Sequence, residues 1–475
     1  MGRRTLATFT AYSYGRIIIK KKAMRVKIMK PSKYNRFILL ENGDYIIFNA
    51  ISCAFTKVNK ETFDQIEGIL QQHEMDNISS ATSDSIEEKL KEGSFLVPED
   101  LDELDLLKIH YKKSCFKSHI LEIIILPTLA CNFNCEYCFV DRHQNSMGEE
   151  IENQVGQFVE DLIDRERGAI SSLHVQWFGG EPMLAFNNIK YLTRIFTEIC
   201  KSRGIEYSAF MFTNGSLLKK RLIPEIKKQK ITEIMVTIDG PREIHNQRRP
   251  FKEGKGSSYD IIISNLKSVI SQIRTIINIT VDKRNYQTIP TLIEDIRAQG
   301  LLNEGSMAKV QFSFVNDSPF CRPDQLFRYD NPDDLKVLIS FIDKVGEYGL
   351  QHIKLPRLAG SHCIANAMNS YIIDPFGYIF KCYINPKKEH SIGHVSKPLN
   401  FFNANNVKIM SFDPFSIEYC RQCEILPLCL GGCVATRLEQ GDKTRPICSF
   451  WKYGLDSSLK IFVKHFSQKN IHNTK

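Results

Sequence analysis

Residues 121–315 alternate between strand-like and helix-like segments, and this alternation restricts the possible folds more than any other feature. Segments whose apolar residues recur at helical spacing lie between the strand-like runs, for example residues 259–270. The apolar runs with strand character are residues 121–126, 174–178, 207–213, 233–238, 275–281 and 310–315. Six strand–helix repeats predict an α/β fold with a parallel sheet, either doubly wound or curled into a partial barrel. In such folds the chemistry lies on the loops that follow the carboxyl ends of the strands.

Cysteine usage is the second unusual feature. The chain has 14 cysteines. Four are isolated (Cys53, Cys115, Cys200 and Cys321), as expected for small buried apolar residues. The other ten are clustered in the sequence: Cys131, Cys135, Cys138, Cys363, Cys382, Cys420, Cys423, Cys429, Cys433 and Cys448. Because no export signal is evident, this clustering favours metal or redox sites over disulfides.

Charge and hydropathy exclude several classes of protein. The chain has 63 basic and 54 acidic side chains, a net charge of +9 over 475 residues, which does not indicate a nucleic-acid partner. Much of the excess lies in residues 1–30, which are expected to form a flexible basic tail, with Met24 a plausible true start. The longest nearly apolar stretch, residues 123–130, is far shorter than the roughly 18 residues that cross a bilayer. We therefore expect a cytoplasmic protein that binds neither nucleic acid nor membranes.

Residues 31–119 are expected to form a small α+β module. Asn42-Gly43 joins two apolar runs, which is a strong hairpin signal. A third strand over residues 54–58 is expected to lead into a helix that starts near Asn59. The last helix of the module is expected to begin at Pro98.

A short cysteine motif follows the first strand of the α/β region directly. It reads Cys131-Asn-Phe-Asn-Cys135-Glu-Tyr-Cys138. Three thiolates on one loop can hold three irons of a cubane cluster and leave the fourth iron without a protein ligand. That vacancy distinguishes a cluster that binds a substrate from one that only carries electrons, which normally has four thiolates. Zinc is the alternative, although structural zinc takes four ligands and the motif itself supplies three.

Glycine-rich and polar motifs follow the next strands. Gly179-Gly180-Glu181-Pro182 comes after the second, Thr213-Asn214-Gly215 after the third, and residues 237–241 end the fourth. The two glycines let the backbone approach a ligand closely, and Glu181 offers a carboxylate to an ammonium group. Arg249 follows shortly and offers a guanidinium to a carboxylate. All of these residues are expected at the same rim of the sheet as the cysteines.

Together these residues resemble the radical SAM superfamily, whose cysteine spacing the loop matches. The resemblance implies that the open iron chelates the methionine end of S-adenosylmethionine (SAM). It also implies SAM contacts from Tyr137 at the adenine, from Gly180 and Glu181 at the ammonium, and from Thr237 and Arg249 at the ribose and carboxylate. One electron from the reduced cluster would then cleave SAM to a 5′-deoxyadenosyl radical that abstracts hydrogen from a substrate. Such a radical requires a water-poor chamber.

The C-terminal third carries a second cysteine pattern. Thirteen residues separate Cys363 from Gly377, and four more separate Gly377 from Cys382. With the five later cysteines, this pattern resembles the SPASM extension of radical SAM enzymes, which carries two auxiliary 4Fe–4S clusters. The resemblance implies one cluster on Cys420, Cys423, Cys429 and Cys448, and the other on Cys363, Cys382 and Cys433.

Two questions about this region stay open in the sequence. Seven ligands cannot close two four-iron clusters, so one site is open or takes an eighth ligand, for which Cys321 is the candidate. A zinc module is the alternative to iron–sulfur clusters, because paired short spacings also suit zinc. Residues 374–377 are expected to form the turn of a hairpin that brings Cys363 and Cys382 together.

The resemblance implies a division into domains. Residues 120–320 would form a partial (β/α)6 barrel, residues 321–450 the SPASM domain, and residues 451–475 a C-terminal helix or tail. The module at 31–119 resembles the winged-helix element by which peptide maturases hold a leader peptide, since a strand edge can add a peptide as a further strand. The expected activity is that of a peptide-modifying oxidoreductase that installs a thioether or other crosslink in a ribosomally synthesised peptide. Its partners would be that substrate, with a leader segment, and a low-potential donor such as flavodoxin or ferredoxin.

Three alternatives are kept. A sulfatase-maturating enzyme, which makes formylglycine, is the nearest, but in that branch an Asp follows the second cysteine of the Cys363/Cys382 pair, whereas Tyr383 stands here. A non-catalytic iron–sulfur electron carrier and a zinc-stapled binding module are the others, and both predict no turnover of SAM. No catalytic acid or base is assigned.

Overall fold

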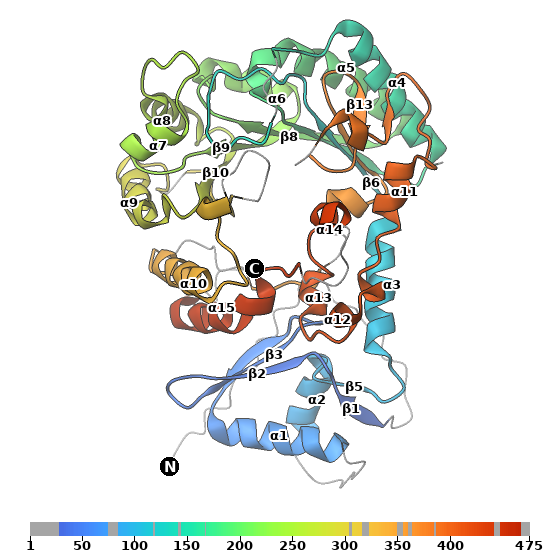
Figure 1. Ribbon diagram of the computed structural model, residues 1–475, viewed down its shortest axis with the longest axis vertical. Helices are drawn as coiled ribbons and strands as arrows, with labels where there is room; N and C mark the ends of the chain where they lie inside the picture. The colour runs from blue at the N-terminus through green and yellow to red at the C-terminus, as the bar shows by residue number, and fades with distance from the viewer. Residues whose placement is uncertain are drawn as a thin grey trace.

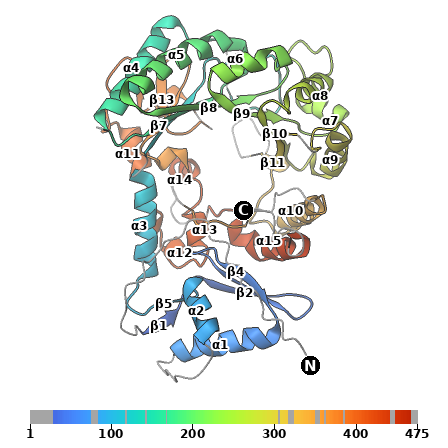
Figure 2. The ribbon, with the colours of Figure 1, turned by 180° about the vertical axis from the view of Figure 1, so that it is seen from behind.

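The computed structural model describes most of the chain as a series of stretches. They are residues 28–74, 84–116, 119–140, 144–166, 168–303, 306–315, 323–348, 355–359, 363–383, 386–440 and 447–466. Residues 1–27, with Met24, and residue Cys321 lie outside the described residues. Within these stretches, no helix has the length and apolar character needed to cross a membrane. Figures 1 and 2 show a large sheet with its helices at one end, a small N-terminal module at the other, and C-terminal segments between them.

Six parallel strands run from one edge of the nine-stranded sheet that the described residues form, and they lie side by side in chain order. They are β6 (Ile120–Ile125), β7 (Ser172–Trp177), β8 (Glu206–Thr213), β9 (Ile231–Thr237), β10 (Arg274–Val281) and β11 (Ala308–Phe314). The six predicted runs coincide with these strands, so the prediction of an α/β fold with a parallel sheet is confirmed. Among these six strands the order never reverses, so they are not doubly wound.

Helices cover one face of this sheet, along its outer side in Figure 1. They are α4 (Glu149–Arg165), α5 (Phe186–Arg203), α6 (Ile223–Lys228), α7 (Arg242–Arg248), α8 (Ser258–Val269) and α9 (Ile289–Ala298). In β7, Leu173, Val175 and Trp177 are fully buried in the core beneath them. The alternate residues His174 and Gln176 lie on the opposite, inner face and are partly exposed. The inner face therefore offers polar side chains to a ligand.

Three strands from the C-terminal third extend the sheet beyond β6. β12 (Ser370–Ile373) pairs with β6 in parallel, and β13 (Tyr378–Phe380) and β14 (Gly393–His394) follow in antiparallel pairing. Ile372 pairs with Phe380, so the hairpin predicted at residues 374–377 is confirmed. The main sheet thus continues across the expected domain boundary at residue 320.

The N-terminal module contains a three-stranded antiparallel sheet and a two-stranded one. The larger sheet is β2 (Asn35–Leu39), β3 (Tyr45–Asn49) and β4 (Phe55–Val58), and the smaller is β1 (Met29–Pro31) with β5 (Leu96–Pro98). The pairing of Leu39 with Tyr45 confirms the hairpin at Asn42-Gly43. Met29 and Lys30, the last residues assigned to the tail, lie in β1.

Three helices complete this module: α1 (Lys60–Glu74), α2 (Asp84–Glu92) and α3 (Glu103–Phe116). α1 begins where it was predicted, because the Asn59 side chain accepts a hydrogen bond from the Thr62 amide at 2.9 Å. The prediction of a helix start at Pro98 is wrong. Pro98 ends β5, and Asp102 caps α3 by accepting from the Leu104 amide at 2.7 Å.

The C-terminal helices lie between the main sheet and the module (Figure 2). They are α10 (Pro332–Gly346), α11 (Ala404–Met410), α12 (Glu418–Arg421), α13 (Leu426–Cys429), α14 (Val434–Gln440) and α15 (Trp451–Phe466). α15 packs against α10, and Lys464 pairs with Asp343 at 2.8 Å across that contact. Residues of β2 and β3 share one apolar core with the segment that carries Cys420 and with α15. The module is therefore packed directly on the cysteine-rich part of the chain.

Candidate functional site

The first cysteine motif lies on the loop between β6 and α4, at the carboxyl end of the sheet. Phe133, inside the motif, forms a backbone bridge with Phe251, and their rings meet edge to face at 4.8 Å. Phe133 is 1% exposed, so it anchors the loop in the core. The loop is therefore tied to the rest of the domain between its first two cysteines.

The three thiols of this loop form one electrostatic group. Burial is the main cause that raises the pKa of Cys135 to about 12, and the neighbouring Cys138 and Cys131 thiols contribute to this rise. Burial also raises the pKa of Cys131, while the Arg249 guanidinium opposes the shift at both Cys131 and Cys135. The Cys131 sulfur accepts the Phe133 amide at 3.4 Å. The Cys131 and Cys135 thiols therefore stay protonated unless a cation stabilises their thiolates.

The glycine pair after β7 packs on the backbone of the cysteine loop. The Gly180 amide donates to Thr128 O at 3.0 Å, and the Glu181 amide donates to Ala130 O at 2.8 Å. A Cβ at Gly180 would lie 2.2 Å from Ala130 O, and one at Gly179, whose φ is +118°, would lie 2.3 Å from Thr128 O. The glycines thus allow a close approach to the protein's own loop, immediately before Cys131.

The Glu181 carboxylate is fully buried and is held by three donors. It accepts from the Met183 amide at 3.0 Å, the Thr213 hydroxyl at 2.8 Å and the Asn214 amide at 2.6 Å. Burial raises its pKa, and these hydrogen bonds oppose the shift. The carboxylate therefore joins the end of β7 to the end of β8, and its contact with a ligand ammonium stays a prediction.

Tyr137 and Arg249 meet at a buried carboxylate that the sequence did not single out. The Tyr137 hydroxyl donates to Asp239 and accepts from Arg249 Nη1 at 2.6 Å. Asp239 is 0% exposed, and its other oxygen accepts from the Thr280 amide at 3.3 Å. Arg249 Nε is buried and has no acceptor among the residues that the structure describes. Thr237 ends β9 nearby, and its hydroxyl lies 3.5 Å from Asn278 Nδ2.

A second arginine completes this polar cluster. Arg248 Nη1 contacts both carboxylate oxygens of Asp282, at 3.1 and 2.9 Å, and the guanidinium lies 5.1 Å from the centre of the Tyr137 ring. Arg248 Nε is 3.8 Å from Asp239. His245 Nδ1 accepts the Asp239 amide at 3.2 Å, and burial holds the pKa of His245 well below its ordinary value. Asp239 is thus fixed by both its backbone and its side chain.

Replacing Asp239 with asparagine should destabilise the fold strongly. The change removes the negative charge that Asp239 places beside the buried guanidinium groups of Arg248 and Arg249. Breaking a buried ion pair costs about 3–5 kcal/mol. The free energy of unfolding, measured by denaturant titration, reports this loss. Asp260→Asn is the control, because Asp260 is half-exposed and pairs with Arg242 on the surface, and it should leave stability almost unchanged. Equal stability of the two variants would contradict the prediction.

The thiols of Cys363, Cys382 and Cys433 lie around Tyr383. Burial raises the pKa of the Tyr383 phenol, and all three thiols raise it further. Tyr383 also contacts the rings of Phe139 and Phe178, with centroids 5.9 and 5.8 Å apart. Because Phe139 follows Cys138 directly, this aromatic contact joins the neighbourhood of the first cysteine motif to that of the second.

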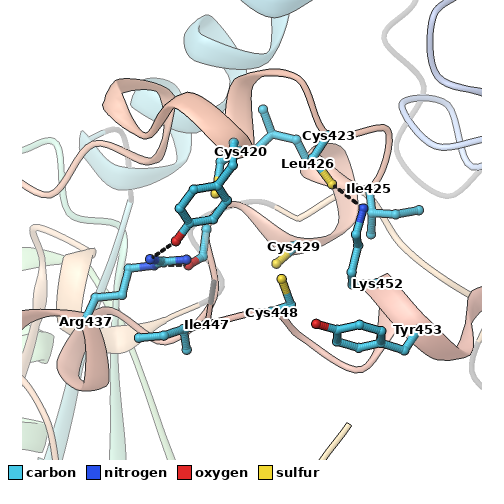
Figure 3. Close-up of a pocket in the computed structure, with 12 residues that line it drawn as sticks. Cys420, Cys423, Ile425, Leu426, Cys429, Arg437, Ile447, Cys448, Lys452 and Tyr453 are labelled. Carbon is cyan, nitrogen blue, oxygen red and sulfur yellow. Dashed lines mark hydrogen bonds between the residues drawn. The ribbon is translucent and has the colours of Figure 1, made fainter. Parts of the chain in front are cut away.

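The remaining four cysteines line one cavity of about 300 Å³. Figure 3 shows the sulfurs of Cys429 and Cys448 facing each other across it. Burial is the main cause that raises the pKa of Cys420 to about 11, and the other three thiols contribute to this rise. Lys452 Nζ lies 3.4 Å from the Cys423 sulfur. The structure thus brings together the set that the resemblance assigned to one auxiliary cluster.

Two glycines that the sequence analysis passed over let the walls of this cavity approach each other. Gly431 and Gly432 have φ values of +81° and +82°. A Cβ at Gly432 would lie 2.0 Å from Ile447 O, in the residue before Cys448. The Gly-Gly pair inside the cysteine pattern was the signal that could have identified this contact.

The central part of the chain matches a known protein superfamily. A model of the radical SAM superfamily matches residues 125–296, from the end of β6 into α9, including the first cysteine motif. The chain contains a radical SAM domain. The radical SAM cyclopropyl synthase TigE of Paramaledivibacter caminithermalis is 23% identical over 238 residues, which are 45% of this chain and about half (49%) of TigE.

Two further comparisons extend beyond the radical SAM domain. The serine-type anaerobic sulfatase-maturating enzyme of Klebsiella aerogenes is 20% identical over 331 residues, which are 67% of this chain and 80% of that protein. The solved structure of native anSMEcpe with bound AdoMet has a TM-score of 0.54 at 17% identity and covers 73% of this chain and 96% of its own. At this identity the likeness shows a common fold.

The site of the radical SAM domain fits the SAM-binding cluster that its superfamily implies. Three thiols are grouped on one loop, with the buried Arg249 Nε left without a protein acceptor. Over the described stretches, no three His, Cys, Asp or Glu side chains are arranged to hold a single metal ion. Three thiols on one loop match the donor set of a cubane cluster that has one iron without a protein ligand.

Proposed function

We propose that this chain uses the reductive cleavage of SAM to abstract hydrogen from a ribosomally synthesised peptide and to install a thioether or other crosslink in it. The observation that carries the proposal is the convergence of the first cysteine motif with Gly180, Glu181 and Arg249 at one end of the parallel sheet. A radical SAM domain supports the chemistry, and a relative whose name describes the maturation of a sulfatase supports a peptide or protein substrate.

The residues of the rim would divide the binding of SAM between them. A cluster on Cys131, Cys135 and Cys138 would supply the electron that cleaves the sulfonium C–S bond. Arg249 has a buried Nε free of protein acceptors, which suits a carboxylate. Tyr137 would lie by the adenine and Thr237 by the ribose. Gly180 and Glu181 would receive the ammonium, with the Glu181 carboxylate positioned by Thr213 and Asn214.

Two auxiliary 4Fe–4S clusters are part of the proposal. One would take Cys420, Cys423, Cys429 and Cys448, which share a cavity. The other would take Cys363, Cys382 and Cys433, with an eighth ligand or an open iron. Because the first motif and Tyr383 are linked through Phe139, the second of these sites borders the chamber in which a substrate would react. A flavodoxin or ferredoxin would supply electrons.

Anaerobically reconstituted protein with SAM and dithionite should release 5′-deoxyadenosine and methionine, measured by chromatography. Added SAM should also change the EPR spectrum of the reduced protein, because it binds an iron directly. Peptides encoded beside the gene are the substrates to test, with mass spectrometry reading a loss of hydrogen from the product. No release of 5′-deoxyadenosine from protein with full iron content would overturn the proposal.

Sulfatase maturation is the second candidate function. The Klebsiella aerogenes relative and the common fold with anSMEcpe favour it. Tyr383 disfavours it, because this residue follows Cys382 where that branch has an Asp. The Tyr383 ring packs on Phe139 and Phe178 instead. Incubation with a sulfatase-derived peptide separates the two, since formylglycine reacts with hydrazines and a crosslinked peptide does not.

A further inference from the structure

Arg36 links the N-terminal module to two separate segments of the cysteine-rich region. It lies on β2, and its Nε and Nη2 atoms bind the two carboxylate oxygens of Asp456 at 3.0 and 2.9 Å. Its Nη1 atom binds Glu424 at 3.1 Å. One guanidinium therefore uses its planar fork on one carboxylate and its remaining edge on another, a geometry that lysine cannot reproduce.

The two carboxylates belong to opposite walls of the four-cysteine cavity. Glu424 follows Cys423 directly, on the wall that carries Cys420, Cys423 and Cys429. Asp456 lies on α15, which begins three residues after Cys448 and supplies Lys452 and Tyr453 to the other wall. Arg36 therefore connects the two walls from outside the cavity.

The apolar core beneath Arg36 holds the same two walls. Ile38, the next inward residue of β2 and 4% exposed, belongs to one cluster with Leu426 of α13 and Leu455 of α15. Apolar packing sets the distance between these segments but not their register, because it has little directional preference. The charge-assisted bonds of Arg36 supply that direction.

We infer that Arg36 is a positioning residue for the four-cysteine cavity, which it holds at the spacing that a cluster requires. The inference rests on the proposed function, in which the four thiols bind a 4Fe–4S cluster. β2 is also an edge strand of its sheet, with Phe37 and Leu39 exposed on it. The clamp, meaning the bonds of Arg36 to Asp456 and Glu424, therefore lies on an edge strand of the module that resembles a peptide-recognition element.

The test compares Arg36→Gln with Arg242→Gln in the full-length, anaerobically reconstituted protein. Arg242 is the matched control, since it also grips one carboxylate, Asp260, with two nitrogens but lies on the radical SAM domain. Iron release to the chelator bathophenanthroline is followed over time, and Cys420→Ala/Cys448→Ala, which leaves two of the four thiols, defines the share of iron in this cavity. Arg36→Gln should release that share at least tenfold faster than the parent, and Arg242→Gln should match the parent.

A second measurement separates positioning from a general loss of folding. Asp456→Asn should accelerate iron release as Arg36→Gln does, and the double variant should be no faster than either single one, because they break the same link. If the effects of the two substitutions on the rate of iron release add, or if Arg36→Gln releases iron at the parental rate, the clamp is wrong. Either result would leave the proposed cluster in place. If Cys420→Ala/Cys448→Ala, which leaves only two of the four thiols, has the iron content of the parent, the cavity holds no cluster, and both the clamp and this part of the proposed function fail.

Discussion

Replacing Cys135 with alanine should reduce the release of 5′-deoxyadenosine to background. Cys135 is the central member of the first motif and is 8% exposed, with its thiol next to those of Cys131 and Cys138. Removing one of three thiolates leaves two corners of a cubane cluster without a protein ligand, so SAM loses the iron it would bind. Iron content should fall by the amount that one cluster holds. It is measured on the same protein samples whose SAM cleavage is followed by chromatography.

Cys200→Ala is the control for this variant. Cys200 is also buried, at 2% exposure, but it lies in α5 within the apolar core, away from the three groups of clustered cysteines. We expect parental SAM cleavage and iron content, with a small loss of stability from the missing sulfur. Residual cleavage by Cys135→Ala above one hundredth of the parental rate would show that the loop does not hold the reactive cluster.

The strands and the grouping of the cysteines could be predicted from the sequence because both depend on residues that are close together in the chain. Each strand of the parallel sheet is a short apolar run between turn residues, so its position follows from a few neighbouring side chains. The hairpin at Asn42-Gly43 and the helix cap at Asn59 are local in the same sense. The prediction of a helix start at Pro98 was wrong because proline also occurs at the ends of strands. The actual cap of the helix, Asp102, lies four residues later.

The features that the sequence did not reveal are long-range. β12 pairs with β6 although about 250 residues separate them, and no local pattern specifies that contact. Asp239 appeared only as part of a turn, because its importance comes from Tyr137 and Arg249, which reach it from other loops. The glycines before Glu181 were assigned to a ligand, whereas the structure places the cysteine loop against them.

That contact makes Gly180 the position where the smallest substitution should have the largest effect. A Cβ at residue 180 would lie 2.2 Å from Ala130 O and 2.6 Å from Leu129 O, and both are backbone atoms that cannot rotate away. The segment leading to Cys131 must therefore move. Overpacking of this kind costs about 1–3 kcal/mol of stability, but a displacement of about 1 Å in a reacting group can cost roughly 100-fold in rate. Gly180→Ala should thus lose about 100-fold in SAM cleavage while remaining folded.

Gly148→Ala isolates this steric effect from the general cost of adding a methyl group. Gly148 lies at the other end of the cysteine-bearing loop, as the residue before α4, with φ of −88°, and a Cβ there would have no atom within 4 Å. This variant should cleave SAM at the parental rate. Since both variants add one methyl group to the same region, a rate loss shared by the two would mean that loop flexibility matters, and a loss confined to Gly180→Ala would mean that the position of Cys131 does. Parental activity in Gly180→Ala would show that the cysteine loop can shift without consequence, which is incompatible with a cluster and SAM held in a fixed geometry at this rim.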